Sequence, residues 1–301
     1  MSLHRRAFLG TALAATAGLA AEEKPLHVAT NQYPWLTFYG RQKRSWDGDV
    51  EGSVKEVARA GLNGLEPLTG SVGQLRSLAP LLKKHDLEMR SLYVNSTLHD
   101  RAVAERSIQE VLAIGDEAKK HGCRILVTNP SPLGGGRRDG KTDAELEVQA
   151  ANLDRLGAEL TRRGQVLAYH NHDVELRYAA REFHHMMVAT DPTKVSLCLD
   201  SHWIFRGAGD SQVALFDVVK LYGKRIVELH LRQSSKGVWT EEFGPGDIDH
   251  VRLVEMVVGL GVKPHLVLEQ AVEGKTPATL DAVTAHQRGT AYVRKIFARM
   301  A

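Results

Sequence analysis

Two histidines end a short apolar run in the middle of the chain, where Val166 to Asp173 reads Val-Leu-Ala-Tyr-His-Asn-His-Asp. The apolar residues and the tyrosine predict a buried strand. Alternation along a strand places His170 and His172 on one face and Asn171 on the other, so both imidazoles can address one cavity. Hydrogen bonds from the rings to loop backbone are the alternative that this stretch alone leaves open.

Other apolar runs of the chain also end in polar or ionisable residues. These residues are Asn31, Glu66, Tyr93 with Asn95, Asn129, His170 with His172, Asp200 with His202, His230 with Arg232, and Glu269 with Gln270. Charged groups rarely end core strands without partners, because an unpaired buried charge is strongly destabilising. A bound divalent cation would satisfy carboxylates and imidazoles together.

From Leu26 onward, an apolar run, a turn and a segment with helical periodicity recur eight times. The predicted strands are Leu26–Thr30, Gly64–Pro67, Glu88–Val94, Arg124–Thr128, Val166–His170, Val195–Asp200, Ile226–Leu231 and His265–Glu269. The predicted helices are Val50–Ala60, Val72–His85, Val103–His121, Asp143–Arg163, Arg181–Thr190, Gln212–Tyr222, Asp249–Leu260 and Pro277–Met300. This order favours an α/β fold of the (β/α)8 barrel type, in which all strand ends open onto one face. A doubly wound sheet is the rival, but no Gly-x-Gly-x-x-Gly follows the first strand.

Composition is that of an ordinary globular protein, with 301 residues, 43% of them hydrophobic, and a net charge of +3. No block of lysine and arginine or interleaving of aromatic and basic residues indicates a nucleic-acid partner. The two cysteines, Cys123 and Cys198, lie inside apolar runs. Buried thiols are therefore expected, with a disulfide as the alternative.

The first residues differ in kind from the rest. His4-Arg5-Arg6-Ala7-Phe8-Leu9 is a twin-arginine pattern, followed by a weakly apolar run that ends in small residues. The run is too short and too rich in alanine for a stable membrane anchor. We expect residues 1–21 to be an export signal to the periplasm and residues 22–301 to be one catalytic barrel. A disordered basic tail is the alternative.

Four strand ends together carry a resemblance to a known group of proteins. They read Tyr-His-Asn-His-Asp, Leu-Asp-Ser-His-Trp, Glu-Leu-His-Leu-Arg and Leu-Val-Leu-Glu-Gln. With them the chain resembles the xylose-isomerase-like barrel superfamily, which includes sugar isomerases and epimerases, inosose dehydratases and the endonuclease IV group. The resemblance spans essentially the whole mature chain. It implies a divalent metal held by His170, Asp200, His230 and Glu269.

The sequence departs from the family pattern at His170, where many relatives have glutamate. Two imidazoles and two carboxylates suit Mn²⁺, Co²⁺, Zn²⁺ or Fe²⁺ better than Mg²⁺ or Ca²⁺, which prefer oxygen ligands. The histidine also removes a carboxylate that serves as a base in related epimerases. A site without metal, in which His170 and His172 bind substrate directly, is the alternative.

The resemblance implies proton transfer next to a carbonyl through an enediolate that a metal stabilises. Glu269 is then a ligand and the base, and His170 is a ligand, a base or both. Glu66 and Glu175 are candidate second acids, and for each a salt bridge or a contact to a substrate hydroxyl is the alternative. Of the two, Glu175 is predicted to be catalytic and Glu66 to bind substrate.

The other residues expected to bind substrate are His172, His202, Trp203 and Arg232. His202 is expected on the same side of its strand end as Asp200. Arg232 could hold a substrate oxygen with two donors, or it could pair with Asp247 or Asp249. Trp203 could stack on a sugar or simply pack over the barrel mouth.

These observations predict a metal-dependent isomerase or epimerase acting on a keto-sugar or polyol. A lyase or dehydratase acting on a keto-sugar or inosose is the first alternative, because the same enediolate can expel a leaving group. A non-catalytic sugar-binding barrel is the second. The expected partners are a small carbohydrate and, by the resemblance, a second copy of the chain in a homodimer.

Overall fold

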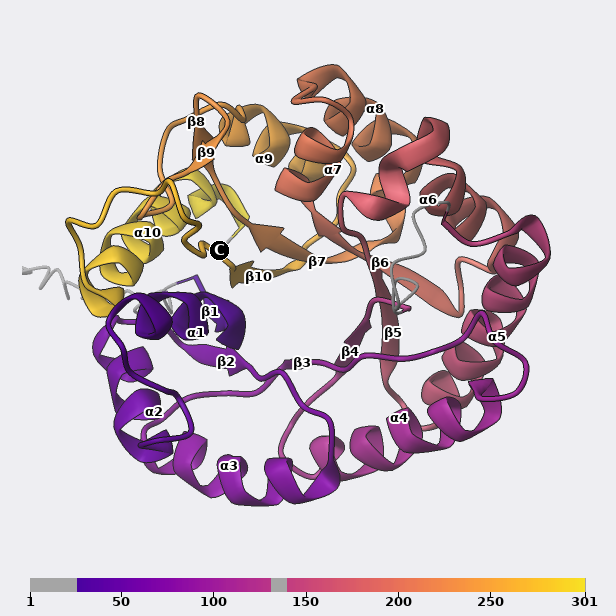
Figure 1. Ribbon diagram of the computed structural model, residues 1–301, viewed down its shortest axis with the longest axis horizontal. Helices are drawn as coiled ribbons and strands as arrows, with labels where there is room; N and C mark the ends of the chain where they lie inside the picture. Colours follow the sequence, from indigo (N-terminus) through magenta and orange to yellow (C-terminus); the bar gives the residue numbers. More distant parts are fainter. Residues whose placement is uncertain (1–25, 131–139, 301) are drawn as a thin grey trace, which may run out of the picture.

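The computed structural model describes residues 26–130 and 140–300. Eight parallel strands form one sheet in the order β2-β1-β10-β7-β6-β5-β4-β3. The two end strands are joined by isolated bridges, Gly64 to Glu88 and Leu68 to Tyr93, so the sheet curls into a barrel inside a ring of helices (Figure 1). This confirms the predicted (β/α)8 architecture.

The strands of the barrel are short, as expected for runs buried on both faces. They are β1 (Ala29–Asn31), β2 (Gly64–Glu66), β3 (Ser91–Tyr93), β4 (Ile125–Thr128), β5 (Val166–His170), β6 (Val195–Asp200), β7 (Ile226–Leu231) and β10 (His265–Leu268). The helices are α1 (Gln32–Arg41), α2 (Val50–Arg59), α3 (Val72–Lys84), α4 (Ala104–Lys119), α5 (Asp143–Arg162), α6 (Arg177–Ala189), α7 (Ser201–Gly207), α8 (Gln212–Tyr222), α9 (His250–Gly259) and α10 (Ala282–Ile296).

Alternation along the strands divides the apolar residues into two cores. Leu167, Leu199 and Leu231 point outward and belong to the large core between sheet and helices. The barrel interior holds a separate small cluster that includes Ala168 and Cys198. Both cysteines are free and buried, as predicted. His170 and Asp200 follow Ala168 and Cys198 by two positions on their strands. They therefore lie on the same strand faces at the carboxyl ends and face the barrel mouth.

Three elements near the mouth were not expected from periodicity. Helices α1 and α7 start directly after β1 and β6, because the side chains of Asn31 and Asp200 cap them by accepting the backbone N–H groups of Tyr33 and Trp203. The hairpin of β8 (Ser234–Ser235) and β9 (Val238–Trp239) follows β7. Polar residues at two strand ends thus also nucleate short helices.

The segment with the twin-arginine pattern lies outside the described residues, so the predicted export signal remains a prediction. Within the residues that the structure does describe, none of the helices combines the length and the apolar character that a bilayer crossing requires.

Gly157 in α5 provides a test of the packing between helix and sheet. A side chain there would overlap the carbonyl oxygen of Lys194, just before β6. We expect Gly157→Ala to lower the free energy of unfolding by about 1–3 kcal/mol, as overpacking does. The matched control is Gly259→Ala at the end of α9, where the added methyl meets nothing within 4 Å. Urea denaturation should show a lower midpoint for the first variant only.

Candidate active site

His230 lies at the centre of the strand-end cluster. It comes from β7, is fully buried, and contacts acidic side chains through both ring nitrogens. Its Nδ1 lies 3.1 Å from Glu269 Oε2, while its Nε2 lies 3.0 Å from Glu66 Oε1 and 3.2 Å from Glu228 Oε1. Burial alone would lower the pKa of His230, but the acidic groups around it, Cys198 and Glu66 foremost, raise it well above its ordinary value.

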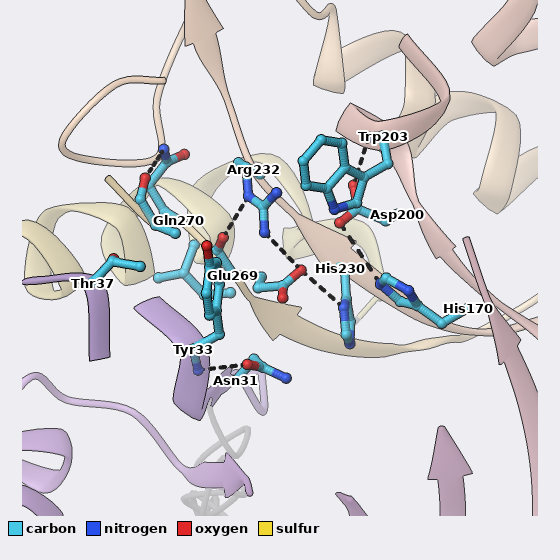
Figure 2. Close-up of polar contacts among 12 residues, drawn as sticks. Asn31, Tyr33, Thr37, His170, Asp200, Trp203, His230, Arg232, Glu269 and Gln270 are labelled. Carbon is cyan, nitrogen blue, oxygen red and sulfur yellow. Dashed lines mark hydrogen bonds and ion pairs between the residues drawn. The ribbon is translucent and has the colours of Figure 1, made fainter. Parts of the chain in front are cut away.

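Arg232 and His230 hold the Glu269 carboxylate between them, as Figure 2 shows. Arg232 donates from Nε to the Glu269 carbonyl oxygen at 2.9 Å, and its Nη2 lies 3.0 Å from Glu269 Oε2. Burial would raise the pKa of Glu269, but Arg232 and His230 outweigh it and hold the pKa well below its usual range. Glu269 is therefore a carboxylate at neutral pH.

The alternative prediction that Arg232 pairs with Asp247 or Asp249 is wrong. Asp247 accepts hydrogen bonds from Ser234 and from the backbone of the hairpin turn, and Asp249 caps α9. Arg232 is instead buried under two indoles, with its guanidinium carbon 4.2 Å from the Trp239 ring centroid and 5.1 Å from that of Trp203. Arginine stacked in this way is fixed in orientation as well as in charge.

Asp200 and His170 lie side by side at the mouth, on the neighbouring strands β6 and β5 (Figure 2). Asp200 Oδ1 accepts the backbone N–H of Trp203 at 2.9 Å, and Oδ2 lies 3.8 Å from His170 Nε2. Among the described residues, Asp200 Oδ2 and both ring nitrogens of His170 have no hydrogen-bond partner. Burial raises the pKa of Asp200 to about 7 and lowers that of His170 well below its ordinary value.

These orphaned groups fit a divalent cation. One ligand atom from each of His170, Asp200, His230 and Glu269 lies within 4.8 Å of the others, and all four residues are buried. Buried polar atoms without partners are costly, and a cation would satisfy the imidazole nitrogens and carboxylate oxygens at once. The structure thus brings together the four residues that the sequence proposed as ligands.

A cavity of about 510 Å³ adjoins this quartet, and Glu269, His172, Trp203 and Tyr33 are among the residues that line it. Its volume is in the range of small-molecule sites. Burial lowers the pKa of His172 to about 4, so its imidazole is neutral at neutral pH. His172 and Trp203, both predicted to bind substrate, thus face the cavity.

Glu66 lies deeper than predicted and is not among the cavity-lining residues. Its Oε1 accepts a hydrogen bond from Asn31 Nδ2 at 2.6 Å and faces His230. A carboxylate on the far nitrogen of a ligating imidazole fixes the orientation of that ring. The contacts of Glu66 therefore support His230 rather than a substrate hydroxyl.

Glu175 is also occupied by structural contacts. Its Oε1 accepts from Asn129 Nδ2 at 3.0 Å, and its Oε2 accepts from the His172 backbone N–H at 2.7 Å. Burial raises its pKa. The role of Glu175 as a second acid stays a prediction. Its contacts to Asn129 and to the His172 backbone hold the loop after β5 in place.

Replacing Glu175 by glutamine separates these two roles. We expect Glu175→Gln to keep the bound metal, because no quartet residue hydrogen-bonds its carboxylate side chain. The Gln amide oxygen can satisfy only part of the Asn129 and His172 contacts, so unfolding should become easier by about 1 kcal/mol. Metal analysis and urea denaturation measure the two effects. Loss of the metal would show that the His172 loop positions the quartet.

His202 does not share a strand face with Asp200, so that expectation is wrong. The chain enters α7 at Ser201, which turns the His202 ring toward Trp203 and Trp239, with centroids at 6.2 Å and 6.0 Å. Both ring nitrogens lack a hydrogen-bond partner among the described residues, and burial lowers the pKa to about 2. His202 is not among the residues that line the cavity, whereas its neighbour Trp203 is.

Sequence reasoning missed Glu228 and the place of Cys198 beside the quartet. Glu228 had a readable signal, since it is a charged residue inside an apolar run and two positions before His230, which places both on one strand face. Cys198 stands in the same relation to Asp200. Trp239 lies over Arg232, because the hairpin after β7 places it there.

Comparisons with known proteins agree with this architecture. A solved sugar phosphate isomerase/epimerase from Parabacteroides distasonis superposes with a TM-score of 0.72 at 16% identity, covering 96% of this chain and 99% of that one. An L-ribulose 3-epimerase structure superposes with a TM-score of 0.69 at 15% identity, covering 91% of this chain and 95% of that one. At these identities the likeness shows the fold alone.

Sequence comparison finds curated relatives and a family. An inosose dehydratase of Clostridium perfringens is 25% identical over 200 residues, which is 63% of this chain and 65% of the relative. The match thus spans just under two thirds of that relative's length. The sequence profile of the family described as "Xylose isomerase-like TIM barrel" matches residues 54–295. Because this match covers most of the chain, the protein belongs to the xylose isomerase-like TIM barrel family.

Proposed function

We propose that this protein is a metal-dependent isomerase or epimerase that moves a proton next to the carbonyl group of a keto-sugar or related polyol. The observation that carries the proposal is the buried quartet of His170, Asp200, His230 and Glu269 beside a cavity of about 510 Å³. The family and the structural likeness to sugar isomerases and epimerases support it.

The metal is proposed to be Mn²⁺, Co²⁺, Zn²⁺ or Fe²⁺, because two imidazoles accompany the two carboxylates. A divalent cation in the quartet would supply Lewis-acid polarisation of a carbonyl oxygen. His230 is prepared for this task, since Glu66 and Glu228 fix one side of its ring and leave Nδ1 toward Glu269.

Proton transfer is assigned to groups that line the cavity. Glu269 is kept ionised by Arg232 and can accept a carbon-bound proton. The neutral imidazole of His172 is the second group. It can take a proton from a substrate hydroxyl and return it to carbon in an epimerisation or to oxygen in an isomerisation, and the Glu269 carboxyl gives back the proton that it accepted. Trp203 offers an apolar ring to the C–H face of a sugar.

Dehydration is the second candidate, favoured by the inosose dehydratase relatives. Its first step is the same, because Glu269 takes the proton next to the carbonyl. The electron pair of the broken C–H bond then forms a carbon–carbon double bond, and the neighbouring C–O bond breaks. The leaving hydroxide takes a proton and departs as water.

Solvent exchange in deuterium oxide tests both candidates. The protein, loaded with Mn²⁺, is incubated with ketopentoses, ketohexoses and an inosose, and products are followed by NMR and mass spectrometry. An isomerase or epimerase yields a product of unchanged formula with deuterium on one carbon, whereas a dehydratase yields loss of one water. Glu269→Gln should be inactive in either case. No exchange with any of these compounds would favour the sugar-binding barrel.

We also propose export through residues 1–21. Changing Arg5 and Arg6 to lysine should hold the full-length protein in the cytoplasm of a bacterium with a twin-arginine pathway. The control changes Lys24 to arginine, outside the signal. Fractionation of cells followed by immunoblotting reads the location, and export of the double-lysine variant would contradict the proposal. Pairing of the chain into a homodimer stays a prediction, and sedimentation of the mature protein tests it.

A further inference from the structure

One layer below the quartet, the barrel interior holds donors that the proposed reaction does not use. Cys198 precedes Asp200 by two residues on β6, so both side chains point into the barrel. The strand register sets Cys198 beside His170 on one side and beside Glu228 on the other. Cys198, His170 and Glu228 are all fully buried.

The distances in this lower layer are those of a ligand set. One ligand atom from each of His170, Cys198 and His230 lies within 4.8 Å of the others. The Cys198 thiol donates to Glu228 Oε1 at 3.5 Å, and His230 turns its Nε2 to the same oxygen at 3.2 Å. His230 thus presents Nδ1 to the mouth and Nε2 to the lower layer.

An independent observation indicates that a ligand belongs here. Both ring nitrogens of His170 and the Oε2 atom of Glu228 lack hydrogen-bond partners among the described residues, although both side chains are fully buried. Such groups are rarely left unsatisfied in a native interior. The mouth quartet needs only one nitrogen of His170 and no atom of Glu228.

We propose that His170, Cys198 and His230 form a second, deeper cation position that takes a thiophilic divalent cation such as Zn²⁺ or Cd²⁺. The proposal deepens the metal chemistry of the proposed function, since the two positions share both histidines. A neutral imidazole has a lone pair on only one ring nitrogen, so each histidine serves one position at a time and the two positions exclude each other. Imidazole and thiolate ligands are those that zinc prefers, whereas the carboxylates at the mouth suit harder ions such as Mn²⁺. Glu228 borders the position, since it contacts both Cys198 and His230.

Binding at this position follows the usual chemistry of a cysteine ligand. The Cys198 S–H bond breaks, a bond from sulfur to the metal forms, and the proton is released to the buffer. A thiophilic ion held there occupies the histidines that the mouth quartet needs. Zn²⁺ or Cd²⁺ should therefore displace Mn²⁺ from the quartet without contacting Asp200 or Glu269.

Cobalt titration of the metal-free mature protein tests the proposal, because a bond from thiolate to Co²⁺ adds a near-ultraviolet charge-transfer band. We expect the wild-type protein to show the band and Cys198→Ser to lose it. The same variant should bind Zn²⁺ at least about tenfold more weakly, with a smaller change for Mn²⁺. Cys123→Ser is the matched control and should keep the band, since Cys123 is equally buried, its thiol donates to the Ile125 carbonyl, and it belongs to none of the ligand groups among the described residues.

Two further measurements separate this proposal from the proposed function. Asp200→Asn breaks the quartet but leaves the deeper ligands, so its thiolate band should remain. X-ray absorption of the wild-type zinc protein should find one sulfur neighbour at about 2.3 Å, and it needs no variant to fold. Metal binding without sulfur would overturn the deeper position and leave the quartet intact. No metal binding by any form would overturn both.

Discussion

Asp200→Asn is expected to remove Mn²⁺ from the quartet and to abolish the turnover. The substitution deletes one of two carboxylates in the quartet, so affinity for Mn²⁺ should fall at least about 100-fold, more than the loss of an outer-shell contact costs. Asparagine keeps an oxygen for the Trp203 backbone N–H, so α7 should stay capped. Elemental analysis after dialysis, together with the deuterium exchange assay, measures both losses.

The matched control for this prediction is Asp249→Asn. Asp249 caps α9 by accepting the backbone N–H of Arg252 at 2.9 Å, the same distance as in the Asp200 cap. It is exposed and takes no part in the quartet. This variant should keep its metal and its activity. A full complement of tightly bound Mn²⁺ in Asp200→Asn would show that the quartet is not the ligand set.

Arg232→Met should destabilise the metal-free protein by about 3–5 kcal/mol, the usual cost of removing one partner of a buried ion pair. The guanidinium is 1% exposed and the Glu269 side chain 8% exposed, so solvent cannot replace the lost charge. Methionine fills much of the space under Trp203 and Trp239, which limits the change to electrostatics and hydrogen bonding. Urea denaturation without metal measures the effect, since a cation would itself neutralise Glu269.

Two comparisons isolate the ion pair. Arg206 also stacks over Trp239, with its guanidinium carbon 5.0 Å from the ring centroid, but it pairs with Glu273 where both side chains are partly exposed. Arg206→Met should therefore cost about 1 kcal/mol or less. Adding Glu269→Gln to Arg232→Met removes the stranded charge and should restore part of the stability. Equal losses for the two arginines would contradict a buried ion pair.

The position of His170 bears on both metal predictions. In the quartet His170 supplies a nitrogen donor, and in the layer below it lies beside the Cys198 thiol. The imidazole and the thiol each make the site softer than one built from carboxylates alone. We therefore expect the site to prefer Mn²⁺, Co²⁺, Zn²⁺ or Fe²⁺ over Mg²⁺ and Ca²⁺.

Much of the fold and the ligand quartet could be predicted from the sequence. The helices and strands follow from local periodicity, and the chain order of strand and helix restricts the sheet to parallel pairing. Parallel strands of a barrel end on one face, so polar residues at their carboxyl ends must meet. That argument gave the ring of polar strand-end residues, and the resemblance to the xylose-isomerase-like barrels singled out His170, Asp200, His230 and Glu269 among them as ligands.

The tertiary structure alone decided how these side chains divide their partners. Arg232 pairs with Glu269 rather than with Asp247, Glu66 supports His230 from below, and Cys198 lies within reach of both histidines. These contacts depend on strand register and barrel closure, which set residues far apart in the chain side by side. No local pattern encodes register, because the same alternation is compatible with several shifts. The sequence by itself therefore determined which groups reach the mouth, and only the closed barrel determined which of them touch.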